Sequence, residues 1–260
     1  MDHNGADTDA RAKASQYYLE MDRMLHRGSE PWSGVETDKW MKTRRWIDVS
    51  IVLLASPLLV PIASIAAFAV WLEDGEKPIV RLQRSGRYGR LLSVAKIRSM
   101  STRKETADQR ITQAKDPRVT RIGRLLRRLR IDEIPQVVQV ARGEMALIGP
   151  RPEDPAFIDL DDPQWIEVLR LRPAIAGLTQ IIASSWESEH LEGPDAQQLY
   201  RQVAVPAKLA IDHWYVRHAS PRVDWMIVTS LGRYLLFGQQ DTPAHHLVRQ
   251  QIPEALPLLT

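Results

Sequence analysis

The sequence contains no cysteine among its 260 residues. Disulfide bonds, a thiolate nucleophile and a zinc site with cysteine ligands are therefore excluded. Residues 49–72 carry no charged side chain. Residues 77–104 carry nine Lys or Arg but no acidic residue. Hydrophobic residues make up 44 % of the chain, which is enough to build a core and argues against a disordered protein. The length fits one domain with appendages.

The uncharged segment at residues 49–72 has 24 residues, enough to cross a bilayer or to insert deeply into one. Pro57 and Pro61 lie in its middle, and each proline removes a backbone donor and disfavours a straight helix. The hydroxyl of Ser56 can satisfy a carbonyl that Pro57 leaves free. We therefore predict a membrane helix with a break at Ser56-Pro57. A kinked, buried helix of a soluble protein is the alternative.

Positive charge flanks this segment on both sides, with Lys39, Lys42, Arg44 and Arg45 before it and Lys77, Arg81, Arg84, Arg87 and Arg90 after it. A single span has its positive charge mainly on the cytoplasmic side. Flanks that are both positive favour a helix–break–helix hairpin that enters and leaves on the cytoplasmic face. Tryptophans near the two ends suit the membrane interface; they are Trp40, Trp46 and Trp71.

The basic block extends to residue 130, and residues 77–130 carry seventeen bases against three acids. Such a block needs an anionic partner or extensive exposure to solvent, and the candidate partners are a nucleic acid, an anionic lipid and a phosphorylated substrate. Nucleic-acid binding through stacked bases needs aromatic rings beside the basic residues. Tyr88 is the only ring in the block, and this disfavours a nucleic-acid partner.

Sequence patterns predict an α+β protein that is mainly helical. The residue pattern predicts strands at residues 79–83 and 91–97, joined by a turn at residues 85–89. Together they are expected to form a small β-hairpin. Apolar periodicity predicts amphipathic interfacial helices; the helices cover residues 118–130, 133–142, 163–172, 196–215 and 224–237. Gly143 is expected to end the second of these helices.

The predicted domain organisation has four parts. Residues 1–38 form a peripheral N-terminal extension with one helix near residues 10–25, and residues 39–76 form the re-entrant membrane hairpin. Residues 77–238 form a cytoplasmic catalytic domain. Residues 239–260 form a C-terminal tail without an assigned role.

Two adjacent carboxylates, Asp132 and Glu133, follow the arginine-rich helix and stand at the predicted start of the next one. Both the nearby arginines and the helix start favour the ionised form of a carboxylate. An ionised carboxylate is a nucleophile towards phosphorus or a ligand for a hard metal ion. The structural alternative is a helix cap with surface ion pairs.

Two further segments place basic side chains in rigid or regular positions. Prolines stiffen the backbone around Arg151 in Gly149-Pro150-Arg151-Pro152, and a rigid arginine suits bidentate phosphate recognition. Lys96 and Arg98 share one face if residues 96–100 are extended. An ordinary turn and a solvated strand edge are the respective alternatives.

In combination these segments resemble the bacterial sugar transferase family, the monotopic phosphoglycosyl transferases. The resemblance covers about residues 39–235 and follows the family's order of motifs. The matching motifs are Arg45-Trp46-Ile47-Asp48, Ser56-Pro57, Gln83-Arg84-Ser85-Gly86, Lys96-Ile97-Arg98-Ser99-Met100, Asp116-Pro117-Arg118-Val119-Thr120-Arg121-Ile122-Gly123, Leu129-Arg130-Ile131-Asp132-Glu133-Ile134-Pro135-Gln136, Arg142-Gly143-Glu144-Met145-Ala146-Leu147-Ile148-Gly149-Pro150-Arg151-Pro152-Glu153 and Arg172-Pro173.

The resemblance implies a small-form enzyme of the bacterial inner membrane whose active site faces the cytoplasm. The family moves a phosphosugar from a nucleotide-sugar, expected to be a UDP-sugar, to polyprenyl (undecaprenyl) phosphate, through a covalent phosphosugar–aspartate intermediate and with Mg²⁺ (or Mn²⁺). This reaction starts glycan, exopolysaccharide or lipopolysaccharide assembly. The implied partners are the nucleotide-sugar, the polyprenyl phosphate and membrane lipids, with no nucleic acid.

Family roles map onto individual residues of this chain. Asp132 matches the nucleophile, and Glu133 matches the neighbouring metal-binding glutamate, with Asp132 as a second metal ligand. The resemblance assigns substrate binding to five basic residues, which are Lys96, Arg98, Arg127, Arg151 and Arg172.

The chain departs from the family pattern after Arg172-Pro173, where the usual Asn-Gly-Arg is replaced by residues 181–189. This stretch resembles a branch of the family with a longer acidic loop, and we expect sugar selection to involve it. The sugar, the nucleotide base and the oligomeric state stay open. Two alternative functions also stay open: a membrane-associated nucleic-acid-binding protein and a non-catalytic membrane scaffold.

Overall fold

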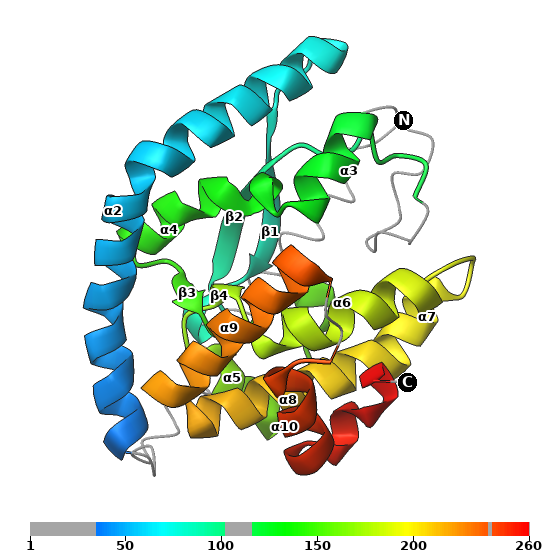
Figure 1. Ribbon diagram of the computed structural model, residues 1–260. Coiled ribbons are helices and arrows are strands. Elements are labelled where there is room, and N and C mark those ends of the chain that lie inside the picture. The colour runs from blue at the N-terminus through cyan, green and yellow to red at the C-terminus, as the bar shows by residue number, and fades with distance from the viewer. Residues whose placement is uncertain (1–34, 102–115, 239–240, 260) are drawn as a thin grey trace.

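The computed structural model describes residues 35–101, 116–238 and 241–259, and this part of the chain is mainly helical (Figure 1). It thereby confirms the predicted mainly helical class with small sheets. The α-helices after the first long one are α3 (Arg121–Arg128), α4 (Val137–Arg142), α5 (Pro163–Leu169), α6 (Leu178–His190), α7 (Ala196–Leu199), α8 (Val205–His218), α9 (Pro221–Phe237) and α10 (Pro243–Gln251). The helix expected near residues 10–25 lies outside the described residues.

Helix α2 (Val35–Asp74) is a continuous helix of 40 residues that includes both prolines. Figure 1 shows that it bends near its middle and does not turn back on itself. The predicted break into two helices is therefore not present. Ser56 Oγ donates a hydrogen bond to the carbonyl of Leu53 over 2.8 Å. Because Pro57 cannot donate to that carbonyl, the serine hydroxyl replaces the missing bond and the helix continues.

One side of α2 packs on the rest of the protein and the other is exposed. Val52, Ala66 and Val70 are buried against the domain, whereas Leu54 is 83 % exposed. The helix is long and apolar enough to cross a membrane, and only 11 % of its most apolar window is buried. A core helix of a soluble protein would bury most of this surface, so that alternative does not describe α2.

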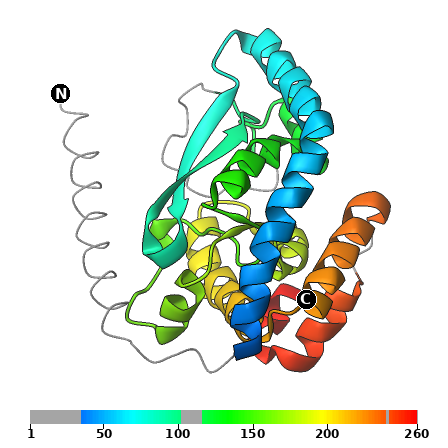
Figure 2. The ribbon, with the colours of Figure 1, turned by 90° about the vertical axis from the view of Figure 1, so that its left-hand side faces the viewer.

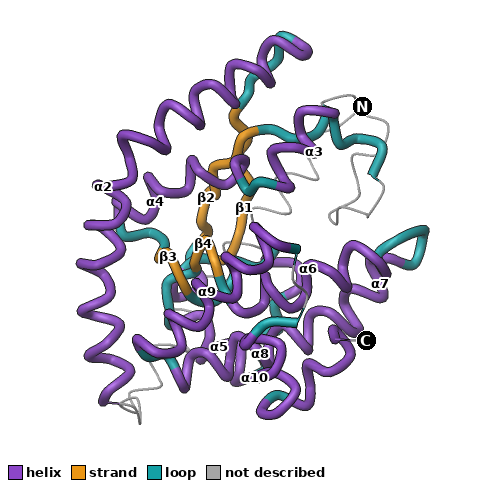
Figure 3. The backbone as a smooth tube through the Cα atoms, viewed as in Figure 1, coloured by secondary structure: helices purple, strands orange, loops and turns teal. Residues whose placement is uncertain are grey.

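Strands β1 (Ile79–Ser85) and β2 (Leu91–Ile97) form the predicted antiparallel hairpin. A second pair, β3 (Ala146–Ile148) and β4 (Ala174–Ala176), is parallel and was not predicted, since three residues are too few to show a pattern. Figure 3 shows the four strands together in the middle of the molecule. Gly177 permits the close packing here, because a side-chain carbon at this position would lie 2.2 Å from the carbonyl oxygen of Gly149.

The largest hydrophobic core lies among α5, α6, α8, α9, α10 and the final 3₁₀ helix Pro253–Leu259, and Ile181, Ile211 and Ile227 are fully buried in it. Figure 2, viewed from the side of α2, shows α2 running along the domain towards these helices. The predicted helix at residues 196–215 is divided into α7, a π-helical turn Tyr200–Ala204 and α8.

Helix α6 corrects the prediction of an acidic loop at residues 181–189. Leu178, Ile182 and Trp186 recur every four residues and are all buried. This spacing places them on one face of a helix, and the acidic and hydroxyl residues between them face elsewhere. The buried apolar face therefore decides the conformation of the segment.

Candidate functional site

A tight turn after α3 positions Asp132 and Glu133. Arg130 has a φ of 57°, in the left-handed region, which is unfavourable for a residue with a side chain and is found where the surrounding structure enforces it. The chain then continues as the 3₁₀ helix Ile131–Gln136 before α4 begins. The α-helix predicted from Glu133 therefore starts later than expected. Both carboxylates are buried, with Asp132 6 % and Glu133 4 % exposed.

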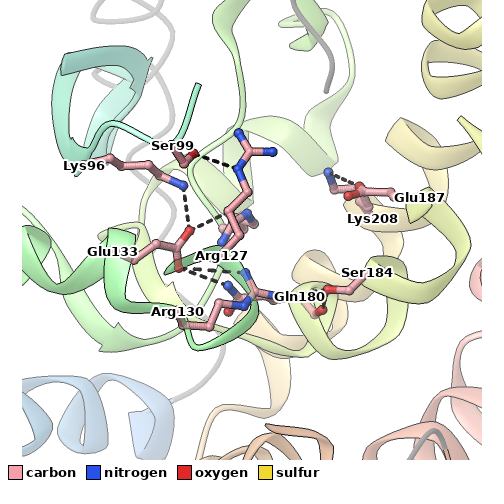
Figure 4. A network of polar contacts seen from close by, with 10 residues as sticks. Lys96, Ser99, Arg127, Arg130, Glu133, Gln180, Ser184, Glu187 and Lys208 are labelled. Carbon is pink, nitrogen blue, oxygen red and sulfur yellow. Dashed lines mark hydrogen bonds and ion pairs between the residues drawn. The ribbon is translucent and has the colours of Figure 1, made fainter. Parts of the chain in front are cut away.

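Glu133 is surrounded by donors from three other parts of the chain (Figure 4). Its Oε1 accepts hydrogen bonds from Lys96 Nζ at 2.7 Å and from Arg151 Nη2 at 3.1 Å. Its Oε2 accepts a bond from Gln180 Nε2 at 3.3 Å. Burial alone would raise the pKa of Glu133, but the charges of Arg151, Lys96 and Arg130 hold it well below its ordinary value. Glu133 is therefore an anion fixed among cations, as predicted.

Asp132 differs from its neighbour, because its Oδ1 is buried and accepts no hydrogen bond within the described residues. Burial raises the pKa of Asp132 above its ordinary value, and the opposing charge of Lys96 offsets this only in part. Arg127 and Arg130 lower this pKa as expected, but desolvation outweighs them, so the net shift is opposite to the expected one. A buried polar atom without a partner is uncommon, and here it is a carboxylate oxygen available to a ligand.

Arg127 is placed by the close contact of α3 with the end of the hairpin. A side-chain carbon on Gly123 would lie 2.0 Å from the carbonyl oxygen of Ser99, so only glycine allows this packing. Arg127 Nε then donates to Ser99 Oγ over 2.7 Å. Figure 4 shows Arg127 on the same side of the site as Lys96.

Arg151 is positioned through two contacts, because Glu133 binds its side chain and Asp212 binds its backbone. The carboxylate of Asp212 on α8 accepts hydrogen bonds from the Arg151 backbone N–H and from the hydroxyl of Thr179. Burial raises the pKa of Asp212 to about 7, although these donors act in the opposite direction. Asp212 therefore positions the turn that carries Arg151.

The charged residues around the two carboxylates line one cavity of about 740 Å³. It brings together Asp132, Glu133, Lys96, Arg127 and Arg151, as the sequence predicted. Its cationic end suits a phosphorylated ligand, because fixed positive charges neutralise phosphate oxygens. The opposite end is lined by residues of α6 and α8 and by residues near them, which are Ser184, Glu187, Ser188, Glu153, Tyr200 and Lys208.

The other two predicted substrate-binding residues are placed differently. Arg98 lines the cavity, but its Nη2 binds Asp74 Oδ1 at 2.6 Å and so links the hairpin to the end of α2. Arg172 is not among the lining residues. Burial and the charges of Arg87 and Arg45 lower its pKa. Its expected contact with substrate in this cavity is therefore not supported.

Several residues of the site were not predicted from the sequence. Gln180 of α6 was not predicted. Ser184 and Glu187 lie in residues 181–189, which were expected to take part in sugar selection as a loop and not as part of a helix. Lys208 was also not predicted, although it lines the cavity from α8. A search for polar residues at helical spacing between buried ones would have found the first three.

The site can be tested for its fit to a divalent metal ion. Within the described residues no cluster of three or more His, Cys, Asp or Glu side chains is present, so the protein offers Asp132 and Glu133 as its carboxylate donors. Mg²⁺ is commonly bound by one or two carboxylates together with substrate phosphates and water. The free Oδ1 of Asp132 is such a donor. Both oxygens of Glu133 already accept hydrogen bonds, so Glu133 would have to exchange one of them to join Asp132 in holding Mg²⁺ that arrives with a phosphorylated substrate.

Comparisons with known proteins point in the same direction. A family model described as bacterial sugar transferase matches residues 39–237. The chain is 34 % identical over 199 residues to a UDP-N-acetylgalactosamine-undecaprenyl-phosphate N-acetylgalactosaminephosphotransferase of Aeromonas hydrophila, which covers 75 % of this chain and 44 % of the relative. It is 37 % identical to a UDP-glucose:undecaprenyl-phosphate glucose-1-phosphate transferase of Caulobacter vibrioides, with 53 % of each chain covered.

A third similar protein is matched over a larger share of its own length. A putative undecaprenyl-phosphate N-acetylgalactosaminyl 1-phosphate transferase of Bacillus subtilis is 33 % identical over 57 % of this chain and 78 % of its own length. The chain thus spans about half the length of the first two relatives and more of the third. The names of the first and third relatives state N-acetylgalactosamine, and the name of the second states glucose.

Proposed function

Because the chain belongs to the bacterial sugar transferase family, we propose that it transfers a sugar 1-phosphate from a nucleoside diphosphate sugar to polyprenyl phosphate. The names of the similar proteins, which state UDP-sugars and undecaprenyl phosphate, support this choice of substrates. The product would begin the assembly of a bacterial glycan or exopolysaccharide.

The proposal rests on two adjacent carboxylates at the cationic end of the cavity, of which one has hydrogen-bond partners for both oxygens and the other has an oxygen without a partner. Glu133 is neutralised by Lys96 and Arg151, whereas Asp132 keeps an oxygen without a partner. A diphosphate bound here would have its charge offset by fixed cations, and phosphoryl transfer depends mainly on such positioning and charge neutralisation.

The reaction then proceeds in two displacements. The carboxylate oxygen of ionised Asp132 that does not hold the metal ion attacks the phosphorus that bears the sugar, the bond from this phosphorus to the bridging oxygen breaks, and a nucleoside monophosphate leaves. A phosphate oxygen of the polyprenyl phosphate next attacks the same phosphorus. The bond to Asp132 breaks, so that the carboxylate is regenerated and a polyprenyl diphosphate sugar is formed.

Asp132 and Glu133 would hold a divalent ion together with the donor phosphates. A bound Mg²⁺ supplies neutralisation of the phosphate charge and favours the ionised form of nearby carboxylates. Lys96, Arg127 and Arg151 contribute the remaining positive charge from the protein.

We place the exposed apolar side of α2 in the cytoplasmic leaflet of the bacterial inner membrane, with the cavity on the cytoplasmic side. Contacts at both ends of the helix support re-entry. Arg44 binds Asp224 of α9, and Asp74 at the other end binds Arg98 of the hairpin. Because both ends of α2 bind the same catalytic domain, these contacts support placing both ends on the same side of the bilayer.

Single cysteines test this topology, since the natural sequence has none. Cysteines at Lys39 and at Lys77 are introduced separately, and sealed inside-out and right-side-out vesicles are labelled with a membrane-impermeant reagent. Both positions are expected to react only from the cytoplasmic side. Reaction from opposite sides would establish a span and refute re-entry.

A donor screen tests the activity itself. The purified protein is incubated with Mg²⁺, polyprenyl phosphate and individual nucleotide-sugars, and the release of nucleoside monophosphate is measured. With donor and Mg²⁺ alone, intact mass after a rapid quench is expected to show one phosphosugar attached to the protein, and the kinetics should be ping-pong. Sequential kinetics without an adduct would contradict the covalent route.

The same preparation discriminates the alternative functions. No turnover with any donor would favour a scaffold, and a salt-sensitive complex with DNA or RNA stronger than that of a generic basic protein would favour nucleic-acid binding.

A further inference from the structure

Helix α6 connects the two ends of the cavity along one face. Gln180, Ser184 and Glu187 are spaced by four and three residues and so lie on the same side of the helix. Gln180 binds Glu133, Ser184 accepts a hydrogen bond from Arg130 Nη2 at 3.2 Å, and Glu187 lies roughly 10 Å further along the helix axis than Gln180. Figure 4 shows Glu187 across the site from Glu133.

A buried lysine anchors Glu187 at this far end. Lys208 Nζ lies 3.1 Å from Glu187 Oε1, 3.2 Å from Glu153 Oε2 and 2.5 Å from the hydroxyl of Tyr200. The Lys208 side chain is only 9 % exposed, whereas that of Glu187 is 33 % exposed and lines the cavity. Within the described residues the second carboxylate oxygen of Glu187 accepts no hydrogen bond.

The two ends of the cavity therefore attract different chemical groups. The near end presents Lys96, Arg127 and Arg151 and suits a diphosphate. At the far end two carboxylates, Glu153 and Glu187, outnumber one lysine, although Arg151 also interacts with both of them electrostatically. This end is therefore less favourable for a phosphate than the near end, while hydroxyl groups can donate to the free carboxylate oxygen of Glu187. In a nucleotide-sugar, the sugar is attached to the phosphorus that Asp132 would attack.

Resting on the proposed function, we infer that Glu187 selects the donor sugar, its Lys208-anchored carboxylate accepting hydrogen bonds from sugar hydroxyl groups. Ser184 and Ser188 add hydroxyl groups to the same wall. Because a site built to accept such bonds discriminates strongly against analogues that lack them, this contact determines which sugars are used.

The test compares Glu187→Gln with the unaltered protein. Glutamine keeps the size and an oxygen that accepts from Lys208, so the fold should be retained. Glu189→Gln is the matched control, because Glu189 lies on the same helix and is exposed outside the cavity. Donors are the preferred nucleotide-sugar and analogues in which single sugar hydroxyls are removed or inverted, and inhibition by the free nucleoside diphosphate is measured in parallel.

Glu187→Gln is expected to lower kcat/KM for the preferred sugar roughly tenfold to a hundredfold. For the analogue that lacks the contacted hydroxyl, kcat/KM should be the same in Glu187→Gln and in the unaltered protein. Inhibition by the nucleoside diphosphate should also be the same in both proteins. Glu189→Gln should behave as the unaltered protein. An unchanged sugar preference, or an equal loss for every donor with a lower Tm, would show that Glu187 only supports Lys208 and would overturn the inference. Weaker inhibition by the nucleoside diphosphate would place the carboxylate at the nucleoside and would also overturn it.

Calorimetry separates this inference from the proposed function. Binding of the nucleotide-sugar, but not of the nucleoside diphosphate, should weaken in Glu187→Gln whether or not turnover occurs. Failure of the proposed function would instead appear in the unaltered protein, as no nucleoside monophosphate release from any donor. Equal nucleotide-sugar binding by both proteins would overturn the inference even if the enzyme is active.

Discussion

Two buried networks of arginine and aspartate or glutamate lie in this protein, and they differ in what they leave unsatisfied. In the network under α2, Asp224 accepts hydrogen bonds from Trp40, Arg44 and Tyr215 on its two oxygens, and none of its polar side-chain atoms is buried without a partner. In the cavity network, Glu133 is equally satisfied, but the adjacent Asp132 keeps an orphan oxygen.

The difference shows how similar residue types serve stability in one place and chemistry in the other. The α2 network has no cavity residue among its members, and its hydrogen bonds fix α2 against α8 and α9. The cavity network has more cations than its carboxylates need and opens to a space of about 740 Å³. Excess positive charge beside a free carboxylate oxygen can bind and react with a phosphorylated ligand.

The largest effect is expected from Asp132→Asn, which removes the nucleophile and retains the shape. Turnover and the covalent adduct should both disappear, a loss of roughly a thousandfold or more, because the amide does not attack phosphorus. Intact mass and nucleoside monophosphate release measure the two effects. Residual turnover with sequential kinetics would reduce Asp132 to a metal ligand or a base.

A change in the α2 network should instead affect folding. Arg44→Met leaves Asp224 and Tyr215 without their buried cation, which typically destabilises by about 3–5 kcal/mol. Thermal unfolding in detergent should show a clearly lower Tm, while the folded molecules keep their activity per molecule. Arg222→Ala, at an exposed position on α9, is the control and should leave Tm unchanged. A loss of activity at full stability would contradict the structural role.

Arg151→Ala should have an intermediate effect and should act on the donor more than on the fold. Losing charge-assisted hydrogen bonds to a phosphate, each worth about 1.5–3 kcal/mol, is expected to lower kcat/KM for the donor roughly tenfold to a hundredfold. Steady-state kinetics and Tm are compared with those of Arg142→Ala, which changes an exposed arginine at the end of α4. Full activity in Arg151→Ala would refute its phosphate role.

The smallest effect concerns Asp212 and depends on pH. Its pKa is raised to about 7 in the folded protein from an ordinary value of 3.8. The folded state therefore holds this proton more tightly than the unfolded state, and stability contributed by the protonated form is lost as pH rises from about 4 through 7. Asp212→Asn should reduce this loss of stability with rising pH. The difference in Tm between Asp212→Asn and the unaltered protein should therefore be more favourable to the variant at pH 8 than at pH 5. Parallel curves would show that Asp212 does not cause the pH dependence.

The sequence by itself determined the parts of this protein whose signals are local or chemically distinctive. The uncharged segment at residues 49–72, the strands on either side of residues 85–89 and the order of motifs around Asp132 were all readable, because alternation, length and charge are properties of neighbouring residues. They were sufficient to predict the family and the association of Lys96, Arg127 and Arg151 with the two carboxylates.

Only the tertiary structure decided features that depend on distant partners. Desolvation raised the pKa of Asp132, packing of apolar residues made residues 178–190 a helix, and a serine hydroxyl kept α2 continuous at Pro57. The placement of Glu187 against Lys208 likewise joins two helices. Burial and contacts across the chain are set by the folded core, and the local sequence does not contain them.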